Sequence, residues 1–428
     1  MQEAFLHFLW QYQNFTDFQL KTTEGQSVKV LKIGFLNSNA GPDFLDARLL
    51  INDIEWVGHV EIHLKASDWF VHGHQQNPAY QNVILHAVWE ADKPILHPDG
   101  SAIPTLLLQP IANLDLINRF ENLVQNPNPI ACASQFGTID QIHKLSMLDK
   151  ALITRLEQKA ELVHQLLATT QNDWEETTYR LLAKNFGFKI NADTFLKLAE
   201  RLPLKILQKH RNNLQQIEAL VFGVAGFLEE NEQADEYWLG LKNEFAFLKA
   251  KYQLTDKILG KFEWKFLRLR PANFPTVRLA QFAKLIEQMS SLFSVFINTE
   301  SSKAINQSLK VSQSAYWKDH FVFGKATDKV PSMGKSSVEN LIINTVVPLL
   351  VAYSQSQDNP DFLDKAIELL ENCPAEENFI TNIWNDLGLK VKNAHDSQAL
   401  IQQYNMMCTP KKCLRCNVGI ALLRQDER

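Results

Sequence analysis

Two acidic residues near the N-terminus, Asp43 and Glu61, lie in or beside short apolar segments. Asp43 follows a Gly-Pro turn signal, and Glu61 lies within the alternating segment "EWVGHVEIHL". If Asp43 leads into a strand next to that of Glu61, the two carboxylates repel each other unless a cation or a proton lies between them. This pattern is typical of a site for Mg²⁺ or Mn²⁺, to which the Ile62 carbonyl adds a third oxygen ligand.

Glu61, His63 and Lys65 follow one another at intervals of two residues. In a β-strand such residues project from one face, while the apolar residues between them project from the other. The apolar set alone is enough to form a core. The polar face is therefore either exposed to solvent or the floor of a site.

Six of the twelve histidines fall between residues 59 and 97. His72 and His74 lie in the expected loop "DWFVHGHQQNPAY", and His86 lies in the next expected strand. A pair of neighbouring strands can bring these residues close to His63, which would suit a transition metal. Their spacing matches no defined metal motif, however. The sequence therefore favours loop histidines that hydrogen-bond to the backbone, with a metal site as the alternative.

The C-terminal segment carries three cysteines, Cys408, Cys413 and Cys416, within nine residues. An odd total of five cysteines, three of them clustered, indicates a metal site rather than a disulfide framework. Basic neighbours favour the thiolate form that binds metal. A tetrahedral zinc ion or an iron–sulfur cluster needs a fourth ligand, for which Cys132 and Cys373 are candidates. The alternative is a set of reduced thiols without metal.

The elements that must position these residues change in type along the chain. Up to about residue 110, short segments rich in Val, Ile and Leu alternate with turn signals, which predicts one helix followed by strands. From about residue 115 the apolar residues recur with the period of a helix. We therefore predict an α+β fold, with a β-rich domain at 1–125 and a helical domain at 126–428, joined at the sequence Asn-Pro-Asn-Pro that starts at Asn126.

Pro42-Asp43, followed by a strand, a turn and Glu61-x-His63, resembles the signature of the PD-(D/E)xK nucleases. The resemblance implies that Asp43 and Glu61 bind the metal and that Glu3, in the preceding helix, is an additional acid. Where that signature has lysine, this chain has His63. Either His63 acts as base or donor in its place, or Lys65 takes over the role of the lysine.

Three segments, "GPDFLDARLLI" with the strands that follow it, "RPANFPTVRLAQFA" and "YNMMCTPKKCLRCNVG", resemble an uncharacterised bacterial family, a domain of unknown function (DUF2851). This second resemblance covers nearly the whole chain. It implies membership of a family and no established activity.

Composition limits the alternatives only weakly. The net charge of −5 provides no general attraction to nucleic acid, so such a partner would need a local basic patch. The N-terminus lacks the features of a signal peptide, and the apolar segment "LIINTVVPLLVAY" is short for a membrane span, so we expect a cytoplasmic protein without a membrane partner. The leading hypothesis is a Mg²⁺- or Mn²⁺-dependent nuclease acting on DNA or RNA. The alternative is a non-catalytic scaffold that binds a partner through the loop containing His72 and His74.

Overall fold

The computed structural model of the chain describes residues 2–17, 19–37, 39–229, 234–299 and 301–424. It forms two compact units, of which the first comprises Met1–Met147 with Tyr404–Arg428 and the second Leu148–Gln403. An N-terminal helix, a mixed sheet and a large helical part confirm the predicted α+β class. Relative to the predicted boundary at 125/126, the first unit extends to Met147 and also includes the C-terminal segment from Tyr404.

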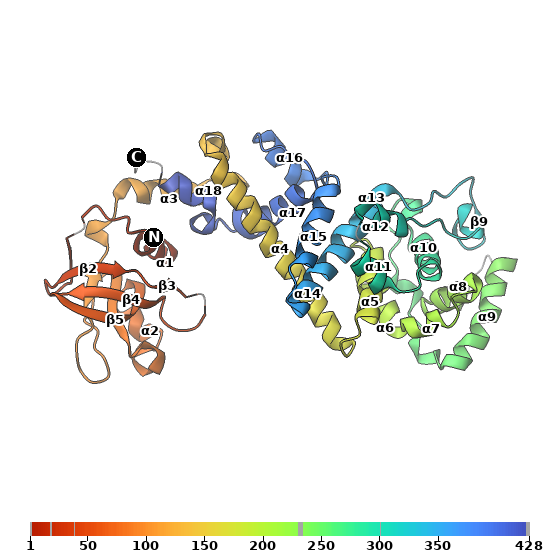
Figure 1. Cartoon of the computed structure of the whole chain (residues 1–428), viewed down its shortest axis with the longest axis horizontal. Helices are drawn as coiled ribbons and strands as arrows, with labels where there is room; N and C mark the ends of the chain where they lie inside the picture. Colours follow the sequence, from red (N-terminus) through yellow and green to blue (C-terminus); the bar gives the residue numbers. More distant parts are fainter. Residues whose placement is uncertain (1, 18, 38, 230–233, 300, 425–428) are drawn as a thin grey trace. The chain divides into compact units, whose positions relative to one another are not determined.

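The first unit is built on a sheet in the order β1-β2-β4-β5-β6-β7, with β3 paired to β4 (Figure 1). The pairs up to β4–β5 are antiparallel, whereas β5–β6 and β6–β7 are parallel. The strands are β1 (Leu20–Lys21), β2 (Ser27–Lys32), β3 (Phe35–Leu36), β4 (Phe44–Ile51), β5 (Ile54–Lys65), β6 (Val83–Glu90) and β7 (Thr105–Leu107).

Two kinds of connection set the strands around the site. Asn52 and Asp53 join β4 to β5, and both have positive φ values, 46° and 65°, as a tight hairpin turn requires. The parallel pair β5–β6 cannot be joined by such a turn, because the chain must return to the starting edge of the sheet. Residues 66–82 make this crossover, which contains α2 (Asp68–Val71), η1 (His74–Gln76) and η2 (Pro78–Tyr80).

Helix α1 (Glu3–Tyr12) packs its apolar side chains against the sheet. Phe5, Leu6 and Leu9 share one core with Val60 and Ile62 of β5. This core accounts for the apolar face that the alternation in β5 predicts. The first unit also contains α3 (Leu114–Gln125) and, from the C-terminal segment, the π-helix η10 (Tyr404–Cys408), η11 (Cys413–Arg415) and α18 (Asn417–Leu423).

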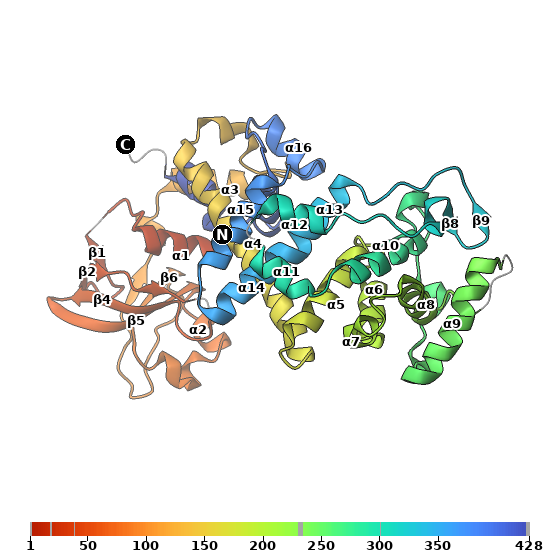
Figure 2. The same cartoon turned by 45° about the vertical axis from the view of Figure 1, so that its right-hand side comes forward.

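The second unit is helical, and α10 (Pro275–Gln288) is almost entirely buried in it, in contact with α5 and α8 (Figure 2). Helix α4 (Gln141–Thr169) begins in the first unit and continues into the second. The other elements are α5 (Trp174–Phe186), α6 (Ala192–Arg201), α7 (Leu204–Gln208), α8 (Leu214–Val224), α9 (Glu236–Tyr252), α11 (Leu292–Asn298), α12 (Ser302–Ser308), β8 (His320–Val322), β9 (Lys325–Ala326), α13 (Lys335–Leu341), the π-helix η9 (Ile342–Val346), α14 (Val347–Gln357), α15 (Asp361–Asn372), α16 (Phe379–Asp386) and α17 (Ala394–Gln403).

The segments α13, η9 and α14 form one continuous helix over Lys335–Gln357, which contains the apolar segment noted in the sequence. Among the described residues, this helix is long and apolar enough to cross a membrane by length and composition. Its most apolar window is 67% buried inside the protein. That degree of burial is what the core helix of a folded unit shows.

Candidate metal centre

Asp43 and Glu61 lie side by side. The carboxylate of each residue accepts a hydrogen bond from a backbone N–H at or directly after the other residue. The N–H of Asp43 donates to Glu61 Oε2 at 3.1 Å, and the N–H of Ile62 donates to Asp43 Oδ2 at 2.9 Å. The predicted proximity of the two acids is therefore present. Ile62 contributes its N–H to the pair, so its expected role as a carbonyl ligand has no counterpart in these contacts.

Glu61 is buried, with only 4% of its surface exposed. Burial raises the pKa of Glu61 to about 9, and the nearby Asp43 carboxylate raises it further in the same direction. The cause is that a charge is costly both away from water and beside a like charge. Without a cation, Glu61 therefore holds a proton at neutral pH, and a bound cation would replace that proton.

Helix α1 adds two polar side chains on the Asp43 side. His7 Nε2 lies 3.3 Å from Asp43 Oδ2 and 3.9 Å from Glu3 Oε1. The ligand atoms of Glu3, His7 and Asp43 all lie within 4.8 Å of one another, which is close enough for one ion. Burial, followed by Asp43, raises the pKa of Glu3.

Two histidines lie beside the other oxygen of Glu61, and a third lies beside one of them. His63 Nε2 lies 3.3 Å and His74 Nε2 3.2 Å from Glu61 Oε1. His72 Nδ1 lies 3.1 Å from His63 Nε2. The ligand atoms of the three histidines are within 4.8 Å of one another. The structure thus brings together the residues for which the sequence left a transition-metal site as the alternative.

The strand register and the crossover explain this convergence. Glu61 on β5 is the partner of His86 on the parallel strand β6, so their side chains share a face with that of His63. The crossover carries His72 and His74 over this same face. Paired strands alone would not predict this arrangement, because it depends on how the whole connection 66–82 folds.

The surroundings of the histidines hold them in place. His63 Nδ1 lies 2.9 Å from His86 Nε2, within a fully buried pair. The ring of His74 stacks on Tyr80 with centroids 3.8 Å apart and meets Trp69 edge-on at 5.3 Å. His72 is the exposed member of the group, so solvent reaches the cluster at that residue.

Burial keeps His63, His74 and His86 neutral at physiological pH. Burial, followed by the neighbouring histidines, lowers the pKa of His63 to about 2. Burial and His72 lower the pKa of His74 to about 4, and burial and His74 lower the pKa of His86 to about 3. Only a neutral imidazole has the lone pair that binds a metal or accepts a proton.

Lys65 occupies a different environment from Glu61 and His63. Its ammonium pairs with Glu90 Oε2 at 3.2 Å, and both side chains are 54% exposed. His63, by contrast, is buried against Glu61. Of the two residues predicted to replace the signature lysine, His63 is therefore the one that faces the carboxylate.

Sequence reasoning did not identify His7. It follows Glu3 by four residues, so the two lie on one face of α1, and this spacing is a signal that the sequence does contain. Trp69 and Tyr80 belong to the same expected loop as His72 and His74. Their packing around His74 depends on the crossover.

Four of the five cysteines belong to the first unit: Cys132, Cys408, Cys413 and Cys416. Burial raises the pKa of Cys132 to about 12, and Cys416 and Cys413 raise it further, because a second thiolate nearby is unfavourable. The expected lowering of the thiol pKa by basic neighbours is outweighed for Cys413, whose pKa burial raises to about 11. Cys373 lies in the second unit, directly after α15.

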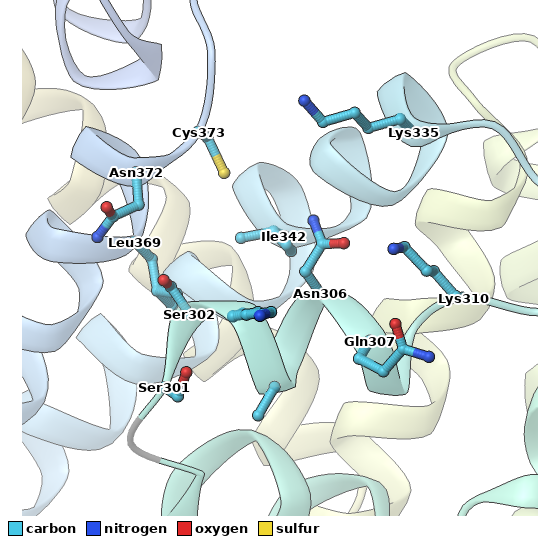
Figure 3. A pocket seen from close by; sticks show the side chains of 12 residues that line it. Ser301, Ser302, Asn306, Gln307, Lys310, Lys335, Ile342, Leu369, Asn372 and Cys373 are labelled. Carbon is cyan, nitrogen blue, oxygen red and sulfur yellow. The ribbon is translucent and has the colours of Figure 1, made fainter.

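The second unit contains a cavity of about 620 Å³ between α12, α13 and α15 (Figure 3). Lys303, Lys310 and Lys335 contribute positive charge to its lining, and Asn306, Gln307 and Asn372 contribute side-chain amides. Of the residues predicted from the sequence, Cys373 lines it. Its lysines and amides would suit an anion, and the described residues of its lining include no carboxylate or imidazole.

Comparison with known proteins adds a family. Residues 3–379 match a family model described as "Protein of unknown function (DUF2851)", in agreement with the resemblance found over most of the sequence. No curated protein and no solved structure matches the chain. The matched range includes the whole cluster around Asp43 and Glu61.

Proposed function

Because the chain belongs to this family of unknown function (DUF2851), whose description states no activity, we propose from the site itself that the protein is a metal-dependent phosphodiester hydrolase acting on DNA or RNA. The observation that carries the proposal is the interlocked pair of Asp43 and Glu61, with His63 and His74 beside Glu61. Carboxylates and imidazoles concentrated in one buried place favour a divalent ion.

When bound, the ion would neutralise the two carboxylates and activate a water for attack on phosphorus, in which a new P–O bond replaces the scissile one and the leaving oxygen departs as an alcohol. Asp43 and Glu61 hold the ion, in agreement with the roles that the nuclease resemblance implies. His63 occupies the lysine position of that signature and, as a neutral imidazole, can bind an ion or accept a proton. The choice of nucleic acid as substrate is supported by the resemblance alone.

We assign to His7 the role of the general base that accepts the proton of the attacking water. Its Nε2 lies 3.3 Å from Asp43 Oδ2, so a water bound beside Asp43 would be within its reach. Glu3, at 3.9 Å from the same nitrogen, would stabilise the imidazolium that forms.

The decisive experiment combines metal binding with cleavage. Wild type, Asp43→Asn and Glu61→Gln are titrated with Mn²⁺ in a calorimeter and incubated with labelled single- and double-stranded DNA and RNA. We expect both variants to lose ion binding and cleavage while remaining folded. Glu55→Gln is the matched control, because Glu55 lies on the same strand but is exposed and paired with Arg48. If wild type binds no ion and cleaves nothing, the hydrolase proposal is wrong and the scaffold hypothesis takes its place.

The C-terminal cysteines support a second, structural metal site. Of the two candidate fourth ligands, Cys132 is the one whose thiol interacts with Cys413 and Cys416. We therefore propose that Cys132, Cys408, Cys413 and Cys416 bind zinc or an iron–sulfur cluster. Helix α18 packs closely against η11 at Gly419. A Cβ atom at this position would lie 2.2 Å from the Cys413 carbonyl oxygen, so the close approach requires glycine.

A further inference from the structure

We infer that His63, His72, His74 and Glu61 form a centre for a resident transition-metal ion of the zinc class, distinct from the Mg²⁺ or Mn²⁺ of the proposed hydrolysis. Glu61 would bridge the two, because Oε1 faces the histidines and Oε2 lies on the Asp43 side. This inference concerns the ion that the histidines hold, and it stands whether or not the protein cleaves nucleic acid.

Three separations between neighbouring ligand atoms are close to those of a tetrahedral site. With metal–ligand bonds of about 2.0–2.1 Å, the ligand atoms of a tetrahedron are about 3.3–3.4 Å apart. The separations are 3.3 Å between Glu61 Oε1 and His63 Nε2, 3.2 Å between Glu61 Oε1 and His74 Nε2, and 3.1 Å between His63 Nε2 and His72 Nδ1. The ligand atoms of the three histidines lie within 4.8 Å of one another, so His72 has to move closer to Glu61 for all four residues to bind one ion.

His74 provides an independent observation. Its side chain is 10% exposed, and its Nε2 is buried without a hydrogen-bond partner in the part of the chain that the structure describes. Glu61 Oε1 is near but not in the geometry of a hydrogen bond. A buried nitrogen that lies 3.2 Å from a carboxylate oxygen without a hydrogen bond is explained if both atoms bind a third atom between them.

The residues that contact the histidine ligands from behind resemble those that orient metal-binding histidines in other proteins. His86 Nε2 lies 2.9 Å from His63 Nδ1, which directs the opposite nitrogen of His63 toward the centre. Stacking on Tyr80 fixes the plane of the His74 ring. His72 is exposed and comes from the crossover, so it provides the side from which an ion enters.

The kind of ion follows from the ligands. Three imidazoles and one carboxylate are ligands typical of zinc, and of related ions such as Co²⁺, whereas Mg²⁺ prefers oxygen atoms and water. The same protein would therefore hold a tightly bound zinc-class ion on the histidine side and a more weakly bound Mg²⁺ or Mn²⁺ on the Asp43 side. This arrangement would suit hydrolysis assisted by two ions.

The test uses the full chain after removal of metal with a chelator, followed by titration with Zn²⁺ and Co²⁺. The variants are His72→Ala, which changes an exposed residue, and His74→Gln. The control is His97→Ala, a histidine of the same unit outside the cluster. We expect each cluster variant to bind at least about 10-fold more weakly and to lose the visible absorption of Co²⁺ in a nitrogen–oxygen site. Cobalt bound by the cysteines is distinguished by thiolate charge-transfer bands in the ultraviolet.

Two results would overturn the inference. One is wild type that binds no Zn²⁺ or Co²⁺ beyond the amount that shows thiolate bands. The other is cluster variants that bind as tightly as His97→Ala. If wild type cleaves with Mn²⁺ but binds no ion at the histidines, the hydrolase proposal holds and this inference is wrong. If wild type binds an ion at the histidines but cleaves with no metal, this inference holds and the hydrolase proposal is wrong.

Discussion

Glu61 shows which properties of a single residue can be predicted from sequence. The alternation of β5 assigns Glu61 and His63 to one face, and the structure buries both. The same alternation includes Lys65, but two residues further along the strand the face is open to solvent and the ammonium pairs with Glu90. A period of two predicts on which face a side chain lies, but not how far along the strand that face is covered.

His7 is the residue at which binding and reaction can be separated. If it accepts the proton of the attacking water, His7→Gln should bind Mn²⁺ within about threefold of wild type and cleave about 100-fold more slowly. Binding should persist because Asp43 and Glu61 remain. The measurements are calorimetric titration and single-turnover cleavage.

Lys65→Ala is the matched control for His7→Gln, and it should change the rate by no more than about twofold because its exposed ion pair contributes little. A loss of about 100-fold in Lys65→Ala would instead assign the role of the signature lysine to Lys65. Loss of Mn²⁺ binding in His7→Gln would make His7 a ligand of the ion.

Lys159 provides a prediction about pH. Its ammonium donates to Asn344 Oδ1 at 3.0 Å and to Gln398 Oε1 at 2.8 Å. Burial, followed by the charge of Arg155, lowers the pKa of Lys159 to about 7, whereas Glu376 opposes this shift. Below pH 7 the lysine is protonated in both the folded and the unfolded state. Between about pH 7 and 10.5 the unfolded state holds one more proton, so the stability of the folded state rises with pH in this window.

Lys159→Met should lack this rise. The difference in free energy of unfolding between Lys159→Met and wild type should therefore shift in favour of wild type as the pH increases from about 7 to about 10. Urea denaturation of both proteins at several pH values measures it. A difference independent of pH would show that Lys159 keeps an ordinary pKa.

At the scale of elements, η9 interrupts a regular helix where the sequence has a proline. Pro348 has no N–H to donate to the carbonyl of Asn344, four residues earlier. The structure supplies another donor, because Asn185 Nδ2 of α5 donates to Asn344 O at 2.9 Å and to Thr345 Oγ1 at 3.0 Å. The proline is visible in the sequence, but a partner 159 residues away can be found only from the fold.

The contribution of the Asn185 amide, which replaces the N–H that Pro348 lacks, can be measured as a change in the free energy of unfolding. Asn185→Ala should lower the free energy of unfolding by about 1–3 kcal/mol, because it leaves a partly buried carbonyl without its donor. In a Pro348→Ala background the loss should be smaller, since the alanine restores the backbone N–H that a regular helix uses. A double-mutant cycle by chemical denaturation gives the coupling. Strict additivity of the two changes would mean that Asn185 acts on other groups.

At the scale of the whole molecule, the change of period near residue 115 indicates correctly that strands give way to helices. It contains no information on the path of the last segment, because periodicity is local. In the structure Leu423 of α18 belongs to the core formed by α1 and the sheet, and Leu414 and Ile420 pack against that core. Periodicity also does not predict the histidine cluster. The cluster forms because the crossover between β5 and β6 folds over the sheet, and no local sequence motif specifies that path.

The C-terminal segment can therefore be attached to the first unit in two ways, by apolar packing and by a metal bound to its cysteines. Leu423→Ala removes a side chain that is 1% exposed and should cost about 2–5 kcal/mol without changing the metal content. If a metal ion joins this segment to Cys132 in wild type, Cys413→Ser should lower both the content of bound zinc or iron and the melting temperature. Elemental analysis of anaerobically purified protein and thermal melting measure both variants. If Cys413→Ser keeps the metal content and melting temperature of wild type, packing alone holds the segment and the thiols bind no metal.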